Sequence, residues 1–214
     1  MEKEFNLVLF DWDGTLCFTD EVIINTIIDI GKVDNNNIYP TREEIMKVAH
    51  LPLRGIVESC FPNLSTLFLE NEYRRLVKNN YAKYSYLYDN VLKTLLALKD
   101  RGYKIGVFSN KNKIELEYVV SFYKLDKVFD IVVAPEDAKH DKPNPSGVYY
   151  AMEKLNVNDI NKVLYVGDNT IDYDTANNAK CKCVIVKYAK RALKDYVKAN
   201  YYVDNFIELL DILK

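Results

Sequence analysis

The sequence has few of the residues that build metal centres or covalent crosslinks. It contains two histidines and four cysteines in 214 residues. Cys17 and Cys60 stand alone, while Cys181 and Cys183 form a C-x-C spacing that matches neither a zinc knuckle nor a C-x-x-C redox pair. Neither histidine lies in a pattern typical of a catalytic base or a metal ligand. We therefore expect buried, reduced cysteines and a cytoplasmic protein.

The sequence also lacks an excess of either charge and any long apolar run. The formal net charge is -2 and the pI is about 5.8, so there is no overall basic field that would attract nucleic acid. No apolar stretch reaches membrane-spanning length, and a strand-like segment begins by Phe5, so we expect no signal peptide. Nucleic acid and membrane are therefore not expected partners, and the sequence gives no indication of oligomeric state.

Short apolar runs alternate with segments of helical periodicity along most of the chain. This alternation is typical of βαβ units and predicts an α/β fold with a Rossmann-like parallel sheet. The expected strands are too short and too uniformly apolar for half-exposed hairpins, which indicates burial on both faces. They are Leu7–Phe10, Lys104–Phe108, Ile131–Ala134, Val163–Val166, Val184–Val186 and Tyr201–Val203.

One long region, from about Cys17 to Ser85, contains only helix signals. It includes an isoleucine-rich amphipathic segment at 21–30, a capping box from Thr41 to Glu44, and a long helical segment at 65–84. We predict a core domain of residues 1–16 and 86–214 and an α-helical cap domain of residues 17–85. Because the insert follows the first strand almost directly, we expect it above the carboxyl end of the sheet, where open α/β folds bind ligands.

Polar side chains follow four of the expected strands at the points where those strands end. Parallel strands align their carboxyl ends along one edge, so distant loops can deliver these side chains to one cleft. Several carboxylates in one cleft require a cation, and oxygen ligands beside a phosphate favour Mg²⁺. The residues are Asp11, Asp13, Ser109, Asn110, Lys142, Asp168 and Asp172.

Four motifs carry these residues, and together they resemble a known family. They are "DWDGTL" (Asp11–Leu16), "GVFSNK" (Gly106–Lys111), "DKPNP" (Asp141–Pro145) and "VGDNTIDYDTANNA" (Val166–Ala179). In this order and spacing the chain resembles a haloacid dehalogenase (HAD) superfamily phosphohydrolase with a helical cap of the C1 type. The segments "LPLRG", "LKDRGYKIGVFSNK" and "YYVDNFIELLDIL" are similar to phosphoglycolate phosphatases and their pyrophosphatase relatives.

The resemblance implies a reaction through an aspartyl-phosphate. Asp11 would be the nucleophile, which splits one hydrolysis into two easier transfers. Asp13 would protonate the leaving alcohol and then take a proton from the attacking water. The implied phosphate-binding residues are Ser109, Asn110 and Lys142. The implied ligands of Mg²⁺ are the carboxylates of Asp11 and Asp168 and the main-chain carbonyl of Asp13, with Asp172 close by, directly or through water.

Other activities of this fold remain to be weighed. Dehalogenases and phosphonoacetaldehyde hydrolases lack the second aspartate of the first motif, whereas Asp13 is present here. Sugar phosphomutases have a different cap, with a histidine early in its first helix, whereas this sequence has no histidine between Asp13 and Ala49. A phosphate-binding regulatory module without turnover would be expected to have lost part of the catalytic set, which is complete. We therefore expect a phosphatase acting on a small phosphorylated metabolite, with inorganic pyrophosphatase and sugar phosphomutase as alternatives.

Four further residues are not part of the proposed catalytic set. Arg54 could bind a second anionic group of a substrate, although a surface salt bridge is the simpler expectation. The role of His50, beside the "LPLRG" loop, is open. Trp12 is expected to pack in the interior rather than to contact substrate. Lys180 stands where relatives carry a glycine, so we expect a left-handed residue that costs about 1 kcal/mol.

Overall fold

The chain divides into two compact units. The computed structural model describes residues 3–33, 39–49 and 51–214. One unit comprises Met1–Cys17 and Leu87–Lys214, and the other comprises Phe18–Tyr86. The second unit is a helical region inserted between two short paired strands, β2 (Cys17–Phe18) and β3 (Tyr86–Leu87). The chain is therefore an α/β protein with an inserted helical region, and the role of that region as a cap stays a prediction.

Six strands of the first unit form one parallel sheet in the order β5-β4-β1-β6-β7-β8. The central strand, β1, is buried along its whole length, with Leu7 aligned to Lys104 on one side and to Val163 on the other. This confirms the expected parallel sheet. The expected burial on both faces holds for the inner strands, whereas the edge strands β5 and β8 are only partly buried, and β7 begins earlier than predicted. The strands are β1 (Leu7–Phe10), β4 (Lys104–Phe108), β5 (Ile131–Val133), β6 (Val163–Gly167), β7 (Lys182–Val186) and β8 (Tyr201–Val203).

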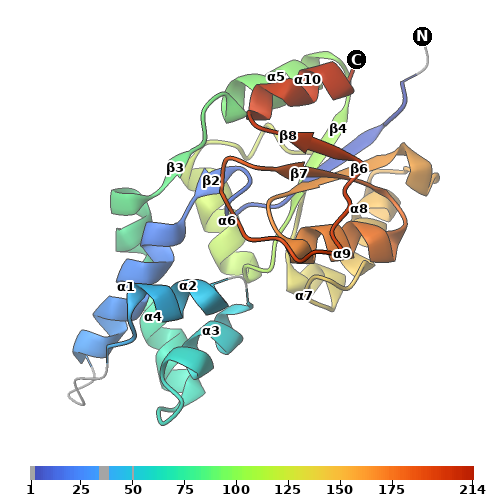
Figure 1. The fold of residues 1–214 in the computed structure, drawn as a ribbon. Helices are drawn as coiled ribbons and strands as arrows, with labels where there is room; N and C mark the ends of the chain where they lie inside the picture. Colours follow the sequence, from blue (N-terminus) through green and yellow to red (C-terminus); the bar gives the residue numbers. More distant parts are fainter. Residues whose placement is uncertain (1–2, 34–38, 50) are drawn as a thin grey trace. The chain divides into compact units, whose positions relative to one another are not determined.

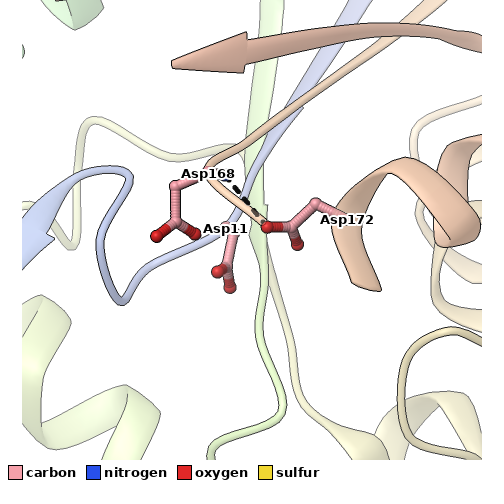
Figure 2. Close-up of side chains that lie close together, drawn as sticks. All are labelled: Asp11, Asp168 and Asp172. Carbon is pink, nitrogen blue, oxygen red and sulfur yellow. Dashed lines mark hydrogen bonds between the residues drawn. The ribbon is translucent and has the colours of Figure 1, made fainter. Parts of the chain in front are cut away.

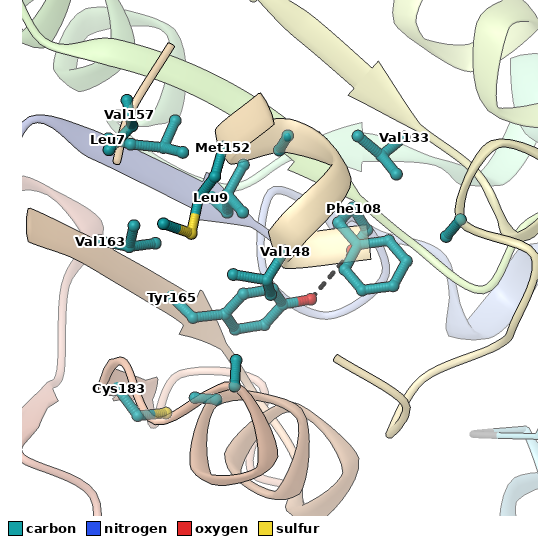
Figure 3. Close-up of a cluster of buried hydrophobic side chains, with 14 of the residues drawn as sticks. Leu7, Leu9, Phe108, Val133, Val148, Met152, Val157, Val163, Tyr165 and Cys183 are labelled. Carbon is teal, nitrogen blue, oxygen red and sulfur yellow. Dashed lines mark hydrogen bonds between the residues drawn. The ribbon is translucent and has the colours of Figure 1, made fainter. Parts of the chain in front are cut away.

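Alternate side chains of β1 enter different parts of the core. Leu7 and Leu9 belong to a cluster that also contains Val148, Val163 and buried residues of the neighbouring helices (Figure 3). Phe10 points elsewhere, and its ring centroid lies 5.6 Å from that of Phe206. This two-residue alternation is what a strand covered by helices on both faces requires.

Helices connect and cover the strands of this unit. α8 and α9 lie on one side of the sheet and α5 and α10 on the other (Figure 1). α5 ends just before Gly102, which has a left-handed φ of 74° that is typical of the end of a helix. The helices are α5 (Val91–Asp100), α6 (Lys113–Phe122), α7 (Pro135–Ala138), α8 (Ser146–Lys154), α9 (Thr170–Ala179) and α10 (Leu209–Ile212), with 3-10 turns at Ile160–Lys162 and Phe206–Glu208.

The inserted region consists of α1 (Asp20–Val33), α2 (Arg42–Val48), α3 (Leu53–Cys60) and α4 (Thr66–Tyr84). Helices α1 and α4 pack together, and the buried Asn80 amide of α4 donates to Thr26 Oγ1 of α1 at 3.0 Å. The predicted capping box is present, because Thr41 Oγ1 accepts from the Glu44 amide and the Glu44 carboxylate accepts from the Thr41 amide.

Several local expectations can be compared with the structure. The "LPLRG" segment is not a simple loop, because Leu53 begins helix α3, and Arg54 forms a salt bridge of 2.9 Å with Glu58 one turn later. Trp12 is fully buried, with its ring 6.0 Å from that of Tyr123, as expected of a packing residue. Lys180 is left-handed, with a φ of 64°, as predicted. His50 lies outside the described residues. Among the described helices, none combines the length and apolar character needed to cross a membrane.

Candidate active site

The site begins where β1 ends. The amide of Asp11 donates to the carbonyl of Val166 at 2.9 Å, so the parallel pairing with β6 continues past the strand and orients the first aspartate. The Asp11 side chain is 6% exposed, whereas that of Asp13 is 25% exposed. Between Asp13 and Cys17 the chain turns at Gly14, which has a φ of 80°. A Cβ atom there would lie 2.0 Å from Asp168 Oδ2, so only glycine permits this close approach.

Asp168 and Asp172 come from the junction of β6 and α9. Asn169 caps this helix, and Asp172 completes a capping box in which its Oδ2 accepts from the amides of Asp168 at 3.0 Å and Asn169 at 3.2 Å. Each of the three buried carboxylates, Asp11, Asp168 and Asp172, offers an oxygen within 4.8 Å of the others (Figure 2). The structure therefore brings together three aspartates from two distant motifs.

Lys142 joins two of these carboxylates. Its Nζ lies 2.7 Å from Asp11 Oδ1 and 2.7 Å from Asp172 Oδ1, and its side chain is almost completely buried. The side chain of Asn110 holds the main chain of Lys142, accepting from its amide at 2.7 Å and donating to its carbonyl at 3.2 Å. Asn110 thus fixes the lysine that contacts the first aspartate, while its predicted contact with phosphate stays a prediction.

Ser109 lies at the end of β4, the strand beside β1. Its side chain is buried, and its amide donates to the carbonyl of Val133 at 3.3 Å. Its Oγ accepts from the amide of Lys111 at 3.3 Å, which ties the hydroxyl to the loop before α6. The parallel register of β4 and β1 explains why this loop lies beside the Asp11 loop. The predicted phosphate-binding role of Ser109 also stays a prediction.

Burial and like charge together make the aspartate cluster electrostatically unfavourable. Burial raises the pKa of Asp11 from 3.8 to about 7, with the Asp172 charge adding to this and Lys142 opposing it. Burial, followed by the charges of Asp172 and Asp11, also raises the pKa of Asp168 well above its ordinary value. For Lys142, burial acts to lower the pKa, but the adjacent carboxylates outweigh it and hold the pKa well above the ordinary value.

Two cations of this region had no role in the sequence-based prediction. Arg191, in the segment after β7, places its Nε 3.0 Å from Asp168 Oδ2. Lys111, the last residue of the second motif, places its Nζ 3.0 Å from Asp13 Oδ2. The motif position of Lys111 was a usable signal. Arg191 stands in no recognisable pattern, so no local signal could have identified it.

The residues present suit a hard divalent cation. The three buried carboxylates outnumber the cations that contact them among the described residues, Lys142 and Arg191. Their oxygens are the ligand type that Mg²⁺ prefers, and the raised pKa values of Asp11 and Asp168 show that further positive charge would stabilise the ionised cluster. The donor set therefore fits the predicted metal.

Comparisons with known proteins agree with this geometry. A model of the haloacid dehalogenase-like hydrolases matches residues 8–186. The chain is 33% identical to the pyrophosphatase PpaX of Bacillus mycoides, an alignment that covers 98% of this chain and 97% of the relative. Its fold is similar to the crystal structure of a predicted phosphoglycolate phosphatase from Haemophilus somnus 129pt, with a TM-score of 0.84, 24% identity and 98% of each chain covered. It is also similar to CbbY of Rhodobacter sphaeroides in complex with phosphate, with a TM-score of 0.84, 18% identity and 96% of each chain covered.

Proposed function

The chain belongs to the haloacid dehalogenase-like hydrolase family, and we propose that it is a Mg²⁺-dependent phosphatase acting through an aspartyl-phosphate on Asp11. The observation that carries this proposal is the set of contacts around Asp11. The carboxylate is buried beside Asp168 and Asp172, and Lys142 holds one of its oxygens at 2.7 Å. A carboxylate that is fixed in this way has lost the freedom that would otherwise slow its attack on phosphorus.

The neighbouring residues have complementary roles in this proposal. Lys142 offsets negative charge at the transferring phosphoryl group, and Ser109 donates a hydrogen bond to it. Asp13 gives a proton to the leaving oxygen and later accepts one from water, for which its partial exposure is suitable. Asp172 accepts hydrogen bonds at both oxygens, so it orients Lys142 and the Asp168 loop.

Mg²⁺ would be held by the carboxylates of Asp11 and Asp168 and by the main-chain carbonyl of Asp13, with Asp172 beside it. When bound, it supplies the positive charge that lets an ionised Asp11 and a phosphate group approach each other. Arg191, which contacts Asp168 Oδ2, adds to the positive charge on the same side of the cluster.

The proposed substrate is a small phosphorylated metabolite of the phosphoglycolate type. Sequence similarity to phosphoglycolate phosphatases and the name of the fold neighbour from Haemophilus somnus support this choice. Inorganic pyrophosphate is the second candidate, because the relative with 33% identity over nearly the whole chain is named a pyrophosphatase. The four free cysteines are consistent with the proposed cytoplasmic location.

The test is phosphate release from a panel containing phosphoglycolate, pyrophosphate, sugar phosphates and nucleotides, with Mg²⁺ or with a chelator. We expect Mg²⁺-dependent release by the wild-type protein and none by Asp11→Asn. Transfer of phosphate between two sugars would instead indicate a phosphomutase. Tight binding of a phosphate compound without turnover would indicate a regulatory module, and release that needs neither Mg²⁺ nor Asp11 would overturn the proposal.

A further inference from the structure

Lys111 makes an ion-pair arrangement that the proposed reaction does not yet use. Its Nζ lies 3.0 Å from Asp13 Oδ2 and 3.1 Å from Glu115 Oε1. The side chains of Lys111 and Glu115 are only 7% and 8% exposed. A lysine and a glutamate buried to this degree are costly unless their positions are specified by partners, so the arrangement is a built feature of the site.

Glu115 is itself firmly held. It occupies the first turn of α6, where its amide donates to Asn112 Oδ1 at 2.9 Å. Its second carboxylate oxygen accepts from the Asn112 side chain at 3.3 Å. Lys111 is tied at its other end, because its amide donates to Ser109 Oγ. The main chain of Lys111 is therefore tied to Ser109, and its ammonium is held between Glu115 Oε1 and Asp13 Oδ2.

Resting on the proposed function, we propose that Lys111, anchored by Glu115, is a positioning residue that directs the Asp13 carboxyl group toward the leaving-group oxygen. The ammonium holds Oδ2, and an oxygen that accepts from an ammonium is poorly suited to carry the proton. Proton transfer is thereby assigned to Asp13 Oδ1. Lys142 has the corresponding position beside Asp11, so each aspartate of the first motif is oriented by its own lysine.

The step that depends on this orientation is as follows. A carboxylate oxygen of Asp11 forms a bond to phosphorus while the bond from phosphorus to the leaving oxygen breaks, and its electron pair stays with that oxygen. The proton on Asp13 Oδ1 passes to the leaving oxygen, which departs as an alcohol and leaves Asp13 ionised. In the second step Asp13 takes a proton from water, the water oxygen bonds to phosphorus, and the bond to Asp11 breaks to release phosphate.

The experiment compares two substrates whose leaving groups differ in their need for a proton. The glycolate group of phosphoglycolate departs as a strongly basic alkoxide unless its oxygen is protonated, whereas p-nitrophenyl phosphate releases the stable p-nitrophenolate. We expect Lys111→Met to lower kcat/KM for phosphoglycolate by about 10-fold to 100-fold, as a misdirected catalytic group does. The loss with p-nitrophenyl phosphate should be much smaller.

Two further variants separate positioning from a general structural effect. In an Asp13→Asn background, Lys111→Met should cause little additional loss, because both substitutions remove the same proton transfer. Glu115→Gln should reproduce the leaving-group dependence more weakly, and it decides the question if Lys111→Met fails to fold. The control is Lys113→Met, since Lys113 begins α6, the helix that carries Glu115, but pairs with Asp137 instead of Asp13.

Equal losses with both substrates, or full additivity with Asp13→Asn, would overturn the role of Lys111 and leave the proposed function intact. A wild-type protein that releases phosphate from neither substrate nor from any other compound of the panel would overturn the proposed function, and the role of Lys111 would fall with it. An active wild type with a leaving-group-dependent Lys111→Met variant supports both.

Discussion

Asp11 and Asp13 are separated by a single residue, yet they lie in different surroundings. Asp11 is almost completely buried, and its lysine, Lys142, also contacts the buried Asp172. Asp13 is partly exposed, and its lysine, Lys111, also contacts Glu115. Each aspartate thus shares a lysine with a second carboxylate, but of the two aspartates only Asp13 is appreciably exposed to solvent. A nucleophile requires a fixed direction, whereas a proton donor must also reach the leaving group and water.

The largest expected effects come from substituting the two aspartates themselves. Asp11→Asn removes the nucleophile and should lower kcat by roughly 10⁴-fold or more. Asp13→Asn removes only proton transfer and should cost about 10²-fold to 10⁴-fold with phosphoglycolate. Steady-state phosphate release with Mg²⁺ measures both. Equal losses for the two variants with p-nitrophenyl phosphate would contradict the division of roles, because that leaving group needs little acid catalysis.

The two lysines should differ in their effect on stability. Without Lys142, Asp11 and Asp172 would be buried without their shared cation, so Lys142→Met should cost about 3–5 kcal/mol of unfolding free energy in metal-free protein. Lys111→Met should cost less, about 1–3 kcal/mol, because Asp13 is partly hydrated and the buried Glu115 keeps its hydrogen bond from the Asn112 side chain. Urea unfolding in the presence of a chelator measures both values. A larger cost for Lys111→Met would show that the burial difference does not govern the energetics.

The pH dependence of metal-free stability should reveal the strain at Asp11. Its pKa is raised from 3.8 to about 7, so the folded protein binds a proton that the unfolded chain has lost in this range. The free energy of unfolding therefore falls as the pH rises from about 4 to about 7, and the full cost of ionising the buried Asp11 is present above pH 7. Asp11→Asn should gain stability relative to wild type as the pH rises from about 4 to about 7, and the difference should be constant above pH 7.

Thermal unfolding with a chelator at several pH values checks this expectation. Added Mg²⁺ should raise the Tm of the wild type at the higher pH more than that of the variant, because the ionised carboxylate is what the cation stabilises. A difference in Tm between variant and wild type that stays constant with pH would contradict the assignment of this strain to Asp11.

The smallest expected effect comes from Lys180, which lies at the opposite end of α9 from Asp172. Lys180 ends α9 in a left-handed conformation with a φ of 64° and a ψ of 30°. Lys180→Gly should stabilise the protein by about 1 kcal/mol without changing kcat. Urea unfolding and phosphate release measure the two quantities. A change in activity would mean that the backbone conformation at the end of α9 affects the positions of Asp168 and Asp172. The end of α9 would then have to be included in the description of the site.

The fold was largely predictable because its signals are local. Uniformly apolar runs marked all six strands of the sheet, and the Thr41–Glu44 spacing marked the start of α2. Helix α3 was missed because "LPLRG" carries a proline and a glycine, which resemble loop signals, whereas the proline precedes the first turn. Arg54 consequently lies on a helix and pairs with Glu58.

The site was predictable only in part. The positions of Asp11, Asp168, Asp172 and Lys142 follow from the rule that parallel strands present their ends along one edge, and the structure brings these residues into contact. The contact between Arg191 and Asp168 was not predictable, because it depends on the path of a segment after β7 that has no regular structure.

Local sequence is sufficient to specify the order of strands and helices and the polar residues that follow each strand, because periodicity, capping and strand-end chemistry act over a few residues. Only the packed sheet decides which lysine contacts which carboxylate. Lys142 reaches Asp11, and Lys111 reaches Asp13, because strands from distant parts of the chain align in register. The same packing buries Asp11 and leaves Asp13 partly exposed to water. Local sequence does not specify this difference between two aspartates that are separated by one residue.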